Sequence, residues 1–148
     1  MALYYLDTSA LVKLYVLEPG TERLLQLVAA PRHKFAILAL APVEFHSAIR
    51  RRERTGDLPK PVADELRARF RRHLESKFLR QTVNEPVLET ALALIDRYPL
   101  RAYDAVQLAG CLILRASSGV EQPIFTSADE EQIRAAEAEG LVSLNPRP

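Results

Sequence analysis

Short apolar runs alternate with longer amphipathic segments along most of the chain. The runs are short enough for buried strands, whereas the longer segments repeat their apolar positions at helical spacing. The expected strands cover residues 2–6, 34–38, 77–83, 123–127 and 141–144. The expected helices cover residues 7–20, 21–30, 41–56, 59–74, 84–98, a segment around Asp104, and residues 129–140.

This alternation predicts an α/β fold with a mostly parallel central sheet and helices on both faces, because parallel neighbours need crossover connections. The arginine-rich helices between residues 43 and 79 interrupt the alternation. We therefore expect them to form a helical arm that extends from the sheet.

Length and composition indicate one domain over residues 1–148, since 148 residues with 48% hydrophobic content suffice for a single core. No apolar run approaches the roughly 18 residues of a membrane span, and the first residues lack the basic start of a secretory signal. We expect a cytoplasmic protein without a membrane span. The single cysteine, Cys111, excludes an internal disulfide and a multi-cysteine zinc site.

Basic residues gather in the middle of the chain, although the net charge is only +1. Arginines cluster at 50–54 and 67–72, whereas the last third is acidic. Such runs are most often the solvated face of a helix, and they also suit contact with RNA or a protein partner. Charge alone leaves both interpretations open.

Four carboxylates that are far apart in the sequence fall at one edge of the predicted sheet. They are Asp7, Glu44, Asp104 and Asp129. Ligands of open parallel sheets gather at this edge, and helical spacing puts Glu44 and Asp104 on inward faces. Converging carboxylates repel one another unless a divalent cation offsets the repulsion. Oxygen ligands without His or Cys favour Mg²⁺ or Mn²⁺.

An alternative interpretation needs no metal. Asp, Thr and Ser are the common residues at helix starts, so Asp7 could simply cap a helix. Thr126 with Asp129, or Ser127 with Glu130, fits a capping box. Glu44 and Asp104 could likewise oppose a helix dipole. The shared position of all four carboxylates favours the metal site over four separate caps.

Four segments resemble, in order and spacing, those of the PIN-domain ribonucleases, in particular the VapC-type toxins of toxin–antitoxin pairs. The segments are YYLDTSALVKLY, APVEFHSAIRR, LRAYDAVQLA and IFTSADEEQIRAAEAEGLVSLNP, which together run almost end to end. The resemblance implies a PIN-like fold and metal-dependent endoribonuclease activity. It also implies RNA as the substrate, a VapB-type antitoxin as a partner, and a homodimer.

The same resemblance assigns roles to individual residues. The family's acidic quartet, catalytic and metal-binding, falls on Asp7, Glu44, Asp104 and Asp129. Substrate-positioning roles fall on Ser9 and Thr126. Whether Glu130 or Glu131 shares the role of Asp129 stays open at this point.

In this context the basic residues gain a possible role. Arg50 and Arg51 are candidates for holding the RNA backbone, where phosphate contacts give affinity without sequence preference. Apolar stripes near residues 10–28 and 60–78 are more extensive than a small sheet can cover, so we expect an antitoxin segment to bind there.

Three other functions fit parts of the pattern. A housekeeping PIN nuclease in RNA processing would share the fold and the carboxylates. A phospho-aspartate protein of the receiver or haloacid-dehalogenase type also has an Asp after its first strand, but here no second Asp lies two residues after Asp7 and no suitable lysine follows a later strand. A non-enzymatic binding module would have no need of all four carboxylates.

Overall fold

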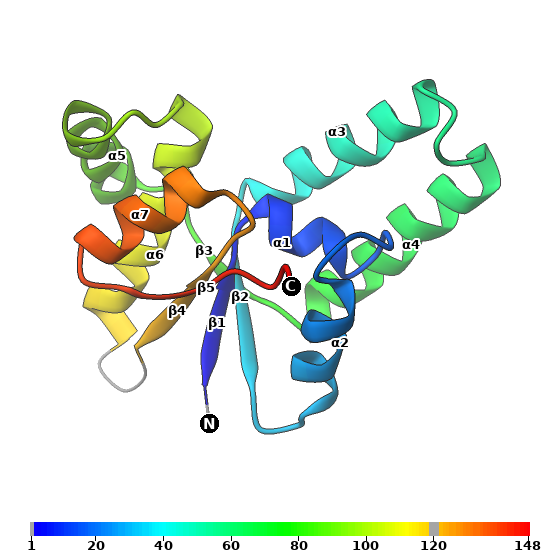
Figure 1. The fold of residues 1–148 in the computed structure, drawn as a ribbon, viewed down its shortest axis with the longest axis horizontal. Helices are drawn as coiled ribbons and strands as arrows, with labels where there is room; N and C mark the ends of the chain where they lie inside the picture. Colours follow the sequence, from blue (N-terminus) through cyan, green and yellow to red (C-terminus); the bar gives the residue numbers. More distant parts are fainter. Residues whose placement is uncertain (1, 119–121) are drawn as a thin grey trace.

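A five-stranded, all-parallel sheet forms the centre of the computed structural model, which describes residues 2–118 and 122–148 (Figure 1). The strand order is β3-β2-β1-β4-β5, so β1 lies in the middle. The strands are β1 (Leu3–Leu6), β2 (Lys34–Leu38), β3 (Leu79–Gln81), β4 (Pro123–Thr126) and β5 (Val142–Leu144). The expected α/β fold with a parallel sheet is confirmed.

Helices cover both faces of this sheet, because alternate side chains of its strands are buried on opposite sides. Leu3 and Tyr5 of β1 enter one apolar cluster with α5, α6 and α7, whereas Tyr4 and Leu6 enter another with the earlier helices. The helices are α1 (Thr8–Lys13), α2 (Thr21–Ala29), α3 (Ala41–Arg54), α4 (Lys60–Ser76), α5 (Glu85–Arg97), α6 (Ala102–Ser118) and α7 (Glu130–Ala138). None of those in the described ranges is long and apolar enough to cross a membrane.

Helices α3 and α4 run together away from the sheet, at the upper right of Figure 1. Aromatic packing joins them near the core, where the ring centroids of Phe45 and Phe70 lie 4.2 Å apart. Farther out, Arg67 of α4 pairs with Glu53 of α3 at 3.1 Å. This pair of helices forms the arm that the arginine-rich segment predicts.

The first helix is shorter than the sequence pattern predicts. It ends at Lys13 instead of continuing to residue 20. Pro19 cannot donate a backbone hydrogen bond, and Gly20 takes a left-handed conformation with φ of 102° before α2 begins. The backbone N–H of Glu18 donates to Thr21 Oγ1 at 3.0 Å, which fixes the turn. The turn brings Glu18 back beside Lys13.

Helix α6 lies unusually close to the sheet. A Cβ atom at Gly110 would lie 2.5 Å from Tyr5 Oη and 2.6 Å from Leu38 Cδ1, so a larger residue would push the helix outward. Ala105 and Ala109 on the same buried face are also small. The close approach brings the first turn of α6, which carries Asp104, to the end of β1.

Candidate active site

Four carboxylates come to the carboxyl edge of the sheet from different elements. Asp7 follows β1, and its backbone N–H donates to the carbonyl of Thr126 at 3.1 Å, which ties the ends of β1 and β4 together. Glu44 and Asp104 lie in the first turns of α3 and α6. Asp129 begins α7. Parallel strands place the starts of the following connections at one edge, which is why this grouping occurs.

Asp7 is buried among hydrogen-bond donors. Its side chain caps α1 by accepting from the Ala10 N–H at 2.9 Å, and it also accepts from the hydroxyls of Ser9 at 2.7 Å and Ser127 at 2.6 Å. Burial raises the pKa of Asp7 to about 6, the hydrogen bonds oppose this shift, and the charge of Asp104 adds to it. The carboxylate is therefore held in a fixed place without a cation among these donors.

Glu44 is half-buried and faces α6. Its Oε1 atom accepts from Gln107 Nε2 at 2.7 Å and from Thr8 Oγ1 at 3.0 Å. Burial raises the pKa of Glu44, these two hydrogen bonds lower it, and the charge of Asp104 raises it again. Neutral donors from two helices thus orient this carboxylate.

Asp104 differs from its neighbours because, within the described residues, its side chain accepts no hydrogen bond. Burial raises its pKa most, followed by the charge of Asp129, while Arg101 lowers it. The charge of Asp104 also raises the pKa of both Asp7 and Glu44. Asp104 is therefore the carboxylate that links the other three electrostatically.

Asp129 is itself the N-cap of α7, whereas the capping box expected from the sequence makes Thr126 the cap and Asp129 its partner three residues later. Its Oδ1 atom accepts from the backbone N–H groups of Glu131 at 2.9 Å and Gln132 at 3.4 Å. Glu130 and Glu131 are exposed, and Glu131 pairs with Arg134. Of these neighbouring acids, it is Asp129 whose charge acts on Asp104.

The four carboxylates share an edge, but their side chains do not converge on one point. Among residues 2–118 and 122–148, no three His, Cys, Asp or Glu side chains form a ready metal-binding group. Hydrogen bonding accounts for this, because Glu44 is directed toward Gln107 and Asp129 toward the backbone of α7. The donor set nevertheless fits a hard divalent cation, since it consists of carboxylate oxygens whose mutual repulsion such an ion would offset.

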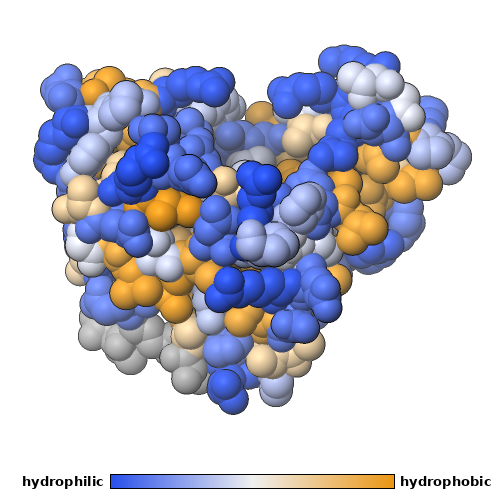
Figure 2. Space-filling view, in the orientation of Figure 1, coloured by the Kyte–Doolittle hydropathy of each residue, from blue (hydrophilic) through white to orange (hydrophobic). Residues whose placement is uncertain are grey.

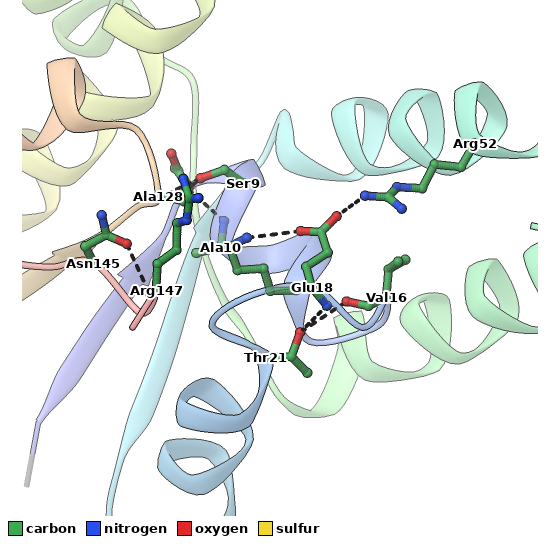
Figure 3. Close-up of polar contacts among 11 residues, drawn as sticks. Ser9, Ala10, Val16, Glu18, Thr21, Arg52, Ala128, Asn145 and Arg147 are labelled. Atoms are coloured by element: carbon green, nitrogen blue, oxygen red, sulfur yellow. Dashed lines mark hydrogen bonds and ion pairs between the residues drawn. The ribbon is translucent and has the colours of Figure 1, made fainter. Parts of the chain in front are cut away.

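The two hydroxyls that the family resemblance singles out have different surroundings. Ser9 lies in the site, where it donates to Asp7 and accepts from the Ala128 N–H at 3.0 Å (Figure 3). Thr126 is fully buried, and its hydroxyl donates to the carbonyl of Ile124 at 3.1 Å. The strand pleat turns it away from the site, and the hydroxyl next to Asp7 belongs to Ser127 instead.

Sequence reasoning missed three polar residues that support the carboxylates. Ser127 contacts Asp7, Gln107 contacts Glu44 and Thr8, and Gln132 donates to the backbone carbonyl of Asp104 at 3.0 Å. Both glutamines are almost completely buried. A signal was present for Gln107, which lies three residues after Asp104 on an otherwise apolar helix face, where a buried amide needs a partner.

A groove of about 460 Å³ leads from these residues along α1 and α3, and we call it the α1–α3 groove. Thr8 and Ser9 line its end near the carboxylates, and its lining includes the basic side chains Lys13, Arg51 and Arg52. Figure 2 shows the surface hollowed between the α3–α4 arm and the opposite part of the molecule. Arg50 does not line this groove.

Arg50 and Arg51, predicted together as RNA contacts, therefore have different environments. Arg50 pairs with Glu53 at 3.1 Å and lines a separate depression with His46 and Arg54. Arg51 is exposed in the α1–α3 groove and has no ion pair within residues 2–118 and 122–148. Adjacent residues of a helix are about 100° apart around its axis, which separates the two side chains.

Several solved structures have a similar fold over almost the whole chain. A toxin–antitoxin complex from Klebsiella pneumoniae superposes with a TM-score of 0.66 at 18% identity, covering 97% of both chains. VapBC2 from Rickettsia felis, bound to a DNA fragment from its promoter, gives 0.65 at 11% identity, covering 97% of this chain and 98% of the other. FitAcB from Neisseria gonorrhoeae gives 0.60 at 16% identity, covering 99% and 98%. At these identities the likeness establishes the fold.

Sequence comparison gives the family directly. No curated protein matches the chain in a sequence search. The family model described as the PIN domain matches residues 4–138, a range that includes all four carboxylates. PIN domains are generally nucleases. The chain belongs to the PIN-domain family.

Proposed function

We propose that this protein is a metal-dependent endoribonuclease that hydrolyses RNA phosphodiester bonds and is the toxin of a VapBC-type toxin–antitoxin pair. The position of Asp104 carries the proposal. Its carboxylate lacks a hydrogen-bond donor among the described residues and raises the pKa of two neighbouring carboxylates. Such a group is electrostatically incomplete without a cation, and PIN domains typically depend on a divalent metal.

The metal would be Mg²⁺ or Mn²⁺, held by Asp7, Glu44, Asp104 and Asp129. When bound, such an ion lowers the pKa of water and offsets the charge on the leaving oxygen. Ser9 and Ser127 hold the two carboxylate oxygens of Asp7, one each. Gln107 and Thr8 hold Glu44. These neutral donors keep the acids in place without neutralising them.

RNA is the substrate that suits the surface beside this site. Four acidic side chains repel a polyanion, so cations near the site are needed to bring the backbone close. Arg51 lies seven residues after Glu44 on α3, about 10 Å along the helix axis, and points into the α1–α3 groove. Arg50 lies on the neighbouring side of α3, where it would contact RNA only beyond the groove.

An antitoxin segment would bind the apolar groove between α2 and α4. This groove has a volume of about 340 Å³, and its lining includes Tyr15, Leu25, Val28 and Phe78. Leu25 and Val28 are exposed, which leaves apolar surface of the expected stripes uncovered. The similar structures named VapBC2 and FitAcB, and the Klebsiella pneumoniae complex, support a partner of this kind. The homodimer stays a prediction.

A housekeeping PIN nuclease in RNA processing would use the same carboxylates. The partner distinguishes the two roles. Purification from the native operon should recover a toxin together with a small co-encoded protein. Recovery of this chain alone and active would contradict the toxin assignment and leave the nuclease assignment standing.

RNA cleavage by the purified protein tests the activity itself. With Mg²⁺ or Mn²⁺ the protein should cleave single-stranded RNA, and EDTA should stop the reaction. Asp7→Asn and Asp104→Asn should each lower the rate at least about a hundredfold, because each removes a metal ligand. Glu89→Gln, an exposed carboxylate on α5, is the matched control and should cleave normally. Cleavage by Asp104→Asn at the parent rate would refute the site.

A further inference from the structure

A buried lysine in the α1–α3 groove shares one carboxylate with an arginine from the opposite wall. Lys13 of α1 is only 6% exposed, and its Nζ atom lies 3.1 Å from Glu18 Oε1. Arg52 reaches across from α3 to the other oxygen of Glu18 (Figure 3). We call these three residues the Lys13–Glu18–Arg52 triad.

The charges of the triad do not balance. Two cations contact a single carboxylate, so one positive charge is left uncompensated within the triad. Arg51 adds another cation to the same groove without an ion pair in the described part of the chain. Asp57 lines the groove as well but contacts none of these cations through a described ion pair. The groove therefore retains capacity for an anion.

The geometry of the triad is that of an anion-binding site whose occupant is a side chain. Each oxygen of Glu18 receives one cationic donor, and two adjacent phosphate oxygens present the same arrangement to lysine and arginine. Glu18 lies in the turn between α1 and α2, outside both helices. The side chain can thus leave the cations by rotating, without unfolding a helix.

The triad is also next to the carboxylate site. The α1–α3 groove joins Lys13 and Arg52 to Thr8 and Ser9, whose hydroxyls donate to Glu44 and Asp7. An RNA strand with one phosphate at the carboxylates would lay a neighbouring phosphate along this groove.

We propose that Lys13, Arg51 and Arg52 bind a backbone phosphate adjacent to the scissile one, and that Glu18 occupies this subsite in the free protein as an internal competitor. The inference rests on the proposed RNA nuclease function. It adds a phosphate subsite and a side chain that competes for it. It also predicts the direction of one effect: removing the carboxylate of Glu18 strengthens RNA binding.

A purely structural ion cluster makes the opposite prediction. If Glu18 only holds Lys13 and Arg52 in place, its loss leaves a buried lysine unpaired and disorders the groove. RNA binding would then weaken. The direction of the change therefore separates the two roles.

The experiment measures the affinity of a short fluorescein-labelled single-stranded RNA of mixed sequence, in Ca²⁺, at several salt concentrations. Glu18→Gln should tighten binding about threefold to fivefold, as expected for removing one partly exposed like charge. Arg52→Met, which leaves the Lys13–Glu18 pair intact, should weaken binding and lower the slope of log affinity against log salt by about 0.7. Glu89→Gln changes the net charge equally and should bind like the parent.

Weaker or unchanged binding by folded Glu18→Gln, checked by circular dichroism, would overturn the proposal. An unchanged salt slope for Arg52→Met would overturn it independently, even if Glu18→Gln failed to fold. These results are distinguishable from failure of the nuclease function, which is read from cleavage by the parent in Mn²⁺. Tighter binding of the co-encoded partner with unchanged RNA binding would refute the subsite and assign the triad to the antitoxin.

Discussion

The sheet edge and the α1–α3 groove adjoin at Thr8 and Ser9 but differ in charge and in the way their charges are held. At the edge, hydroxyl, amide and backbone donors orient Asp7, Glu44 and Asp129, whereas Asp104 accepts no hydrogen bond from the described residues. In the groove, Lys13 and Arg52 share Glu18, and Arg51 has no ion pair with any residue that the structure describes. Neutral donors fix an acid without removing its charge, whereas ion pairs offset charge. The edge thus stays ready for a cation and the groove for an anion.

The largest expected effect is on stability, where a change of pH tests whether the carboxylates at the sheet edge oppose folding. Burial raises the pKa of Asp7 from 3.8 to about 6, so the folded protein binds this proton more tightly than the unfolded chain does. Stability is then greatest below the unfolded pKa and falls as the pH rises through the folded one. In EDTA, the titration of Asp7 should lower the free energy of unfolding by about 2 kcal/mol between about pH 4 and pH 7.

Urea denaturation at a series of pH values measures this loss. Asp7→Asn should flatten the profile, because the titrating group is gone. Glu89→Gln should retain the slope of the parent, since Glu89 is exposed on α5. The same pH dependence in Asp7→Asn and in the parent would show that the Asp7 carboxylate does not oppose folding.

Gln107 tests whether the neutral donors matter to function. Gln107→Leu keeps the size of the side chain and removes the donor to Glu44. We expect cleavage to fall about tenfold at limiting Mn²⁺, because a hydrogen bond to a charged group contributes about 1.5–3 kcal/mol. Gln107→Glu should fall further, since it adds a carboxylate beside Glu44.

The control is Gln26→Leu on the exposed side of α2, which should cleave like the parent. Excess Mn²⁺ should partly restore Gln107→Leu if the amide orients a metal ligand. A rate that does not respond to Mn²⁺ would instead make Gln107 a packing residue.

The smallest expected effect is on RNA binding, where variants of Arg50 and Arg51 test whether RNA runs along the α1–α3 groove. Arg51→Ala should lower the salt slope of RNA binding by about 0.7, the loss of one phosphate contact with a single strand. Arg50→Ala should change it less, because Arg50 pairs with Glu53 and lies outside the groove. Equal losses for both variants would show that RNA runs over the outer face of α3 and not along the groove.

Most of the fold could be predicted from the sequence because the apolar positions repeat at the period of the element they form. The expected strand over residues 34–38 matches β2, and the expected helix over 84–98 nearly matches α5. Errors arose where local chemistry stops an element early. The first helix ends at Lys13, although its apolar pattern continues through Val16, and Pro19 and Gly20 form the turn that leads into α2.

The candidate site was predictable in part. Asp7 and Asp129 follow strands, so their position at the edge follows from parallel topology. Thr126 and Ser127 could not be told apart, because which hydroxyl faces Asp7 depends on where β4 ends and on its pleat. The sequence could not distinguish the roles of Arg50 and Arg51 either, because the rotation of α3 about its axis decides which of them enters the groove.

By itself, the sequence determined the order of strands and helices along the chain. It also determined which carboxylates follow a strand or lie at the start of a helix, because the hydrophobic period and the chemistry of helix starts depend on residues that are close in sequence. Only the tertiary structure decided which side chains contact one another across the fold. Gln107 contacts Thr8 across 99 positions of the chain, and Ser127 contacts Asp7 across 120. Arg52 and Glu18 are 34 positions apart. Such contacts depend on the crossing of helices and the register of strands, which packing sets for the whole molecule at once.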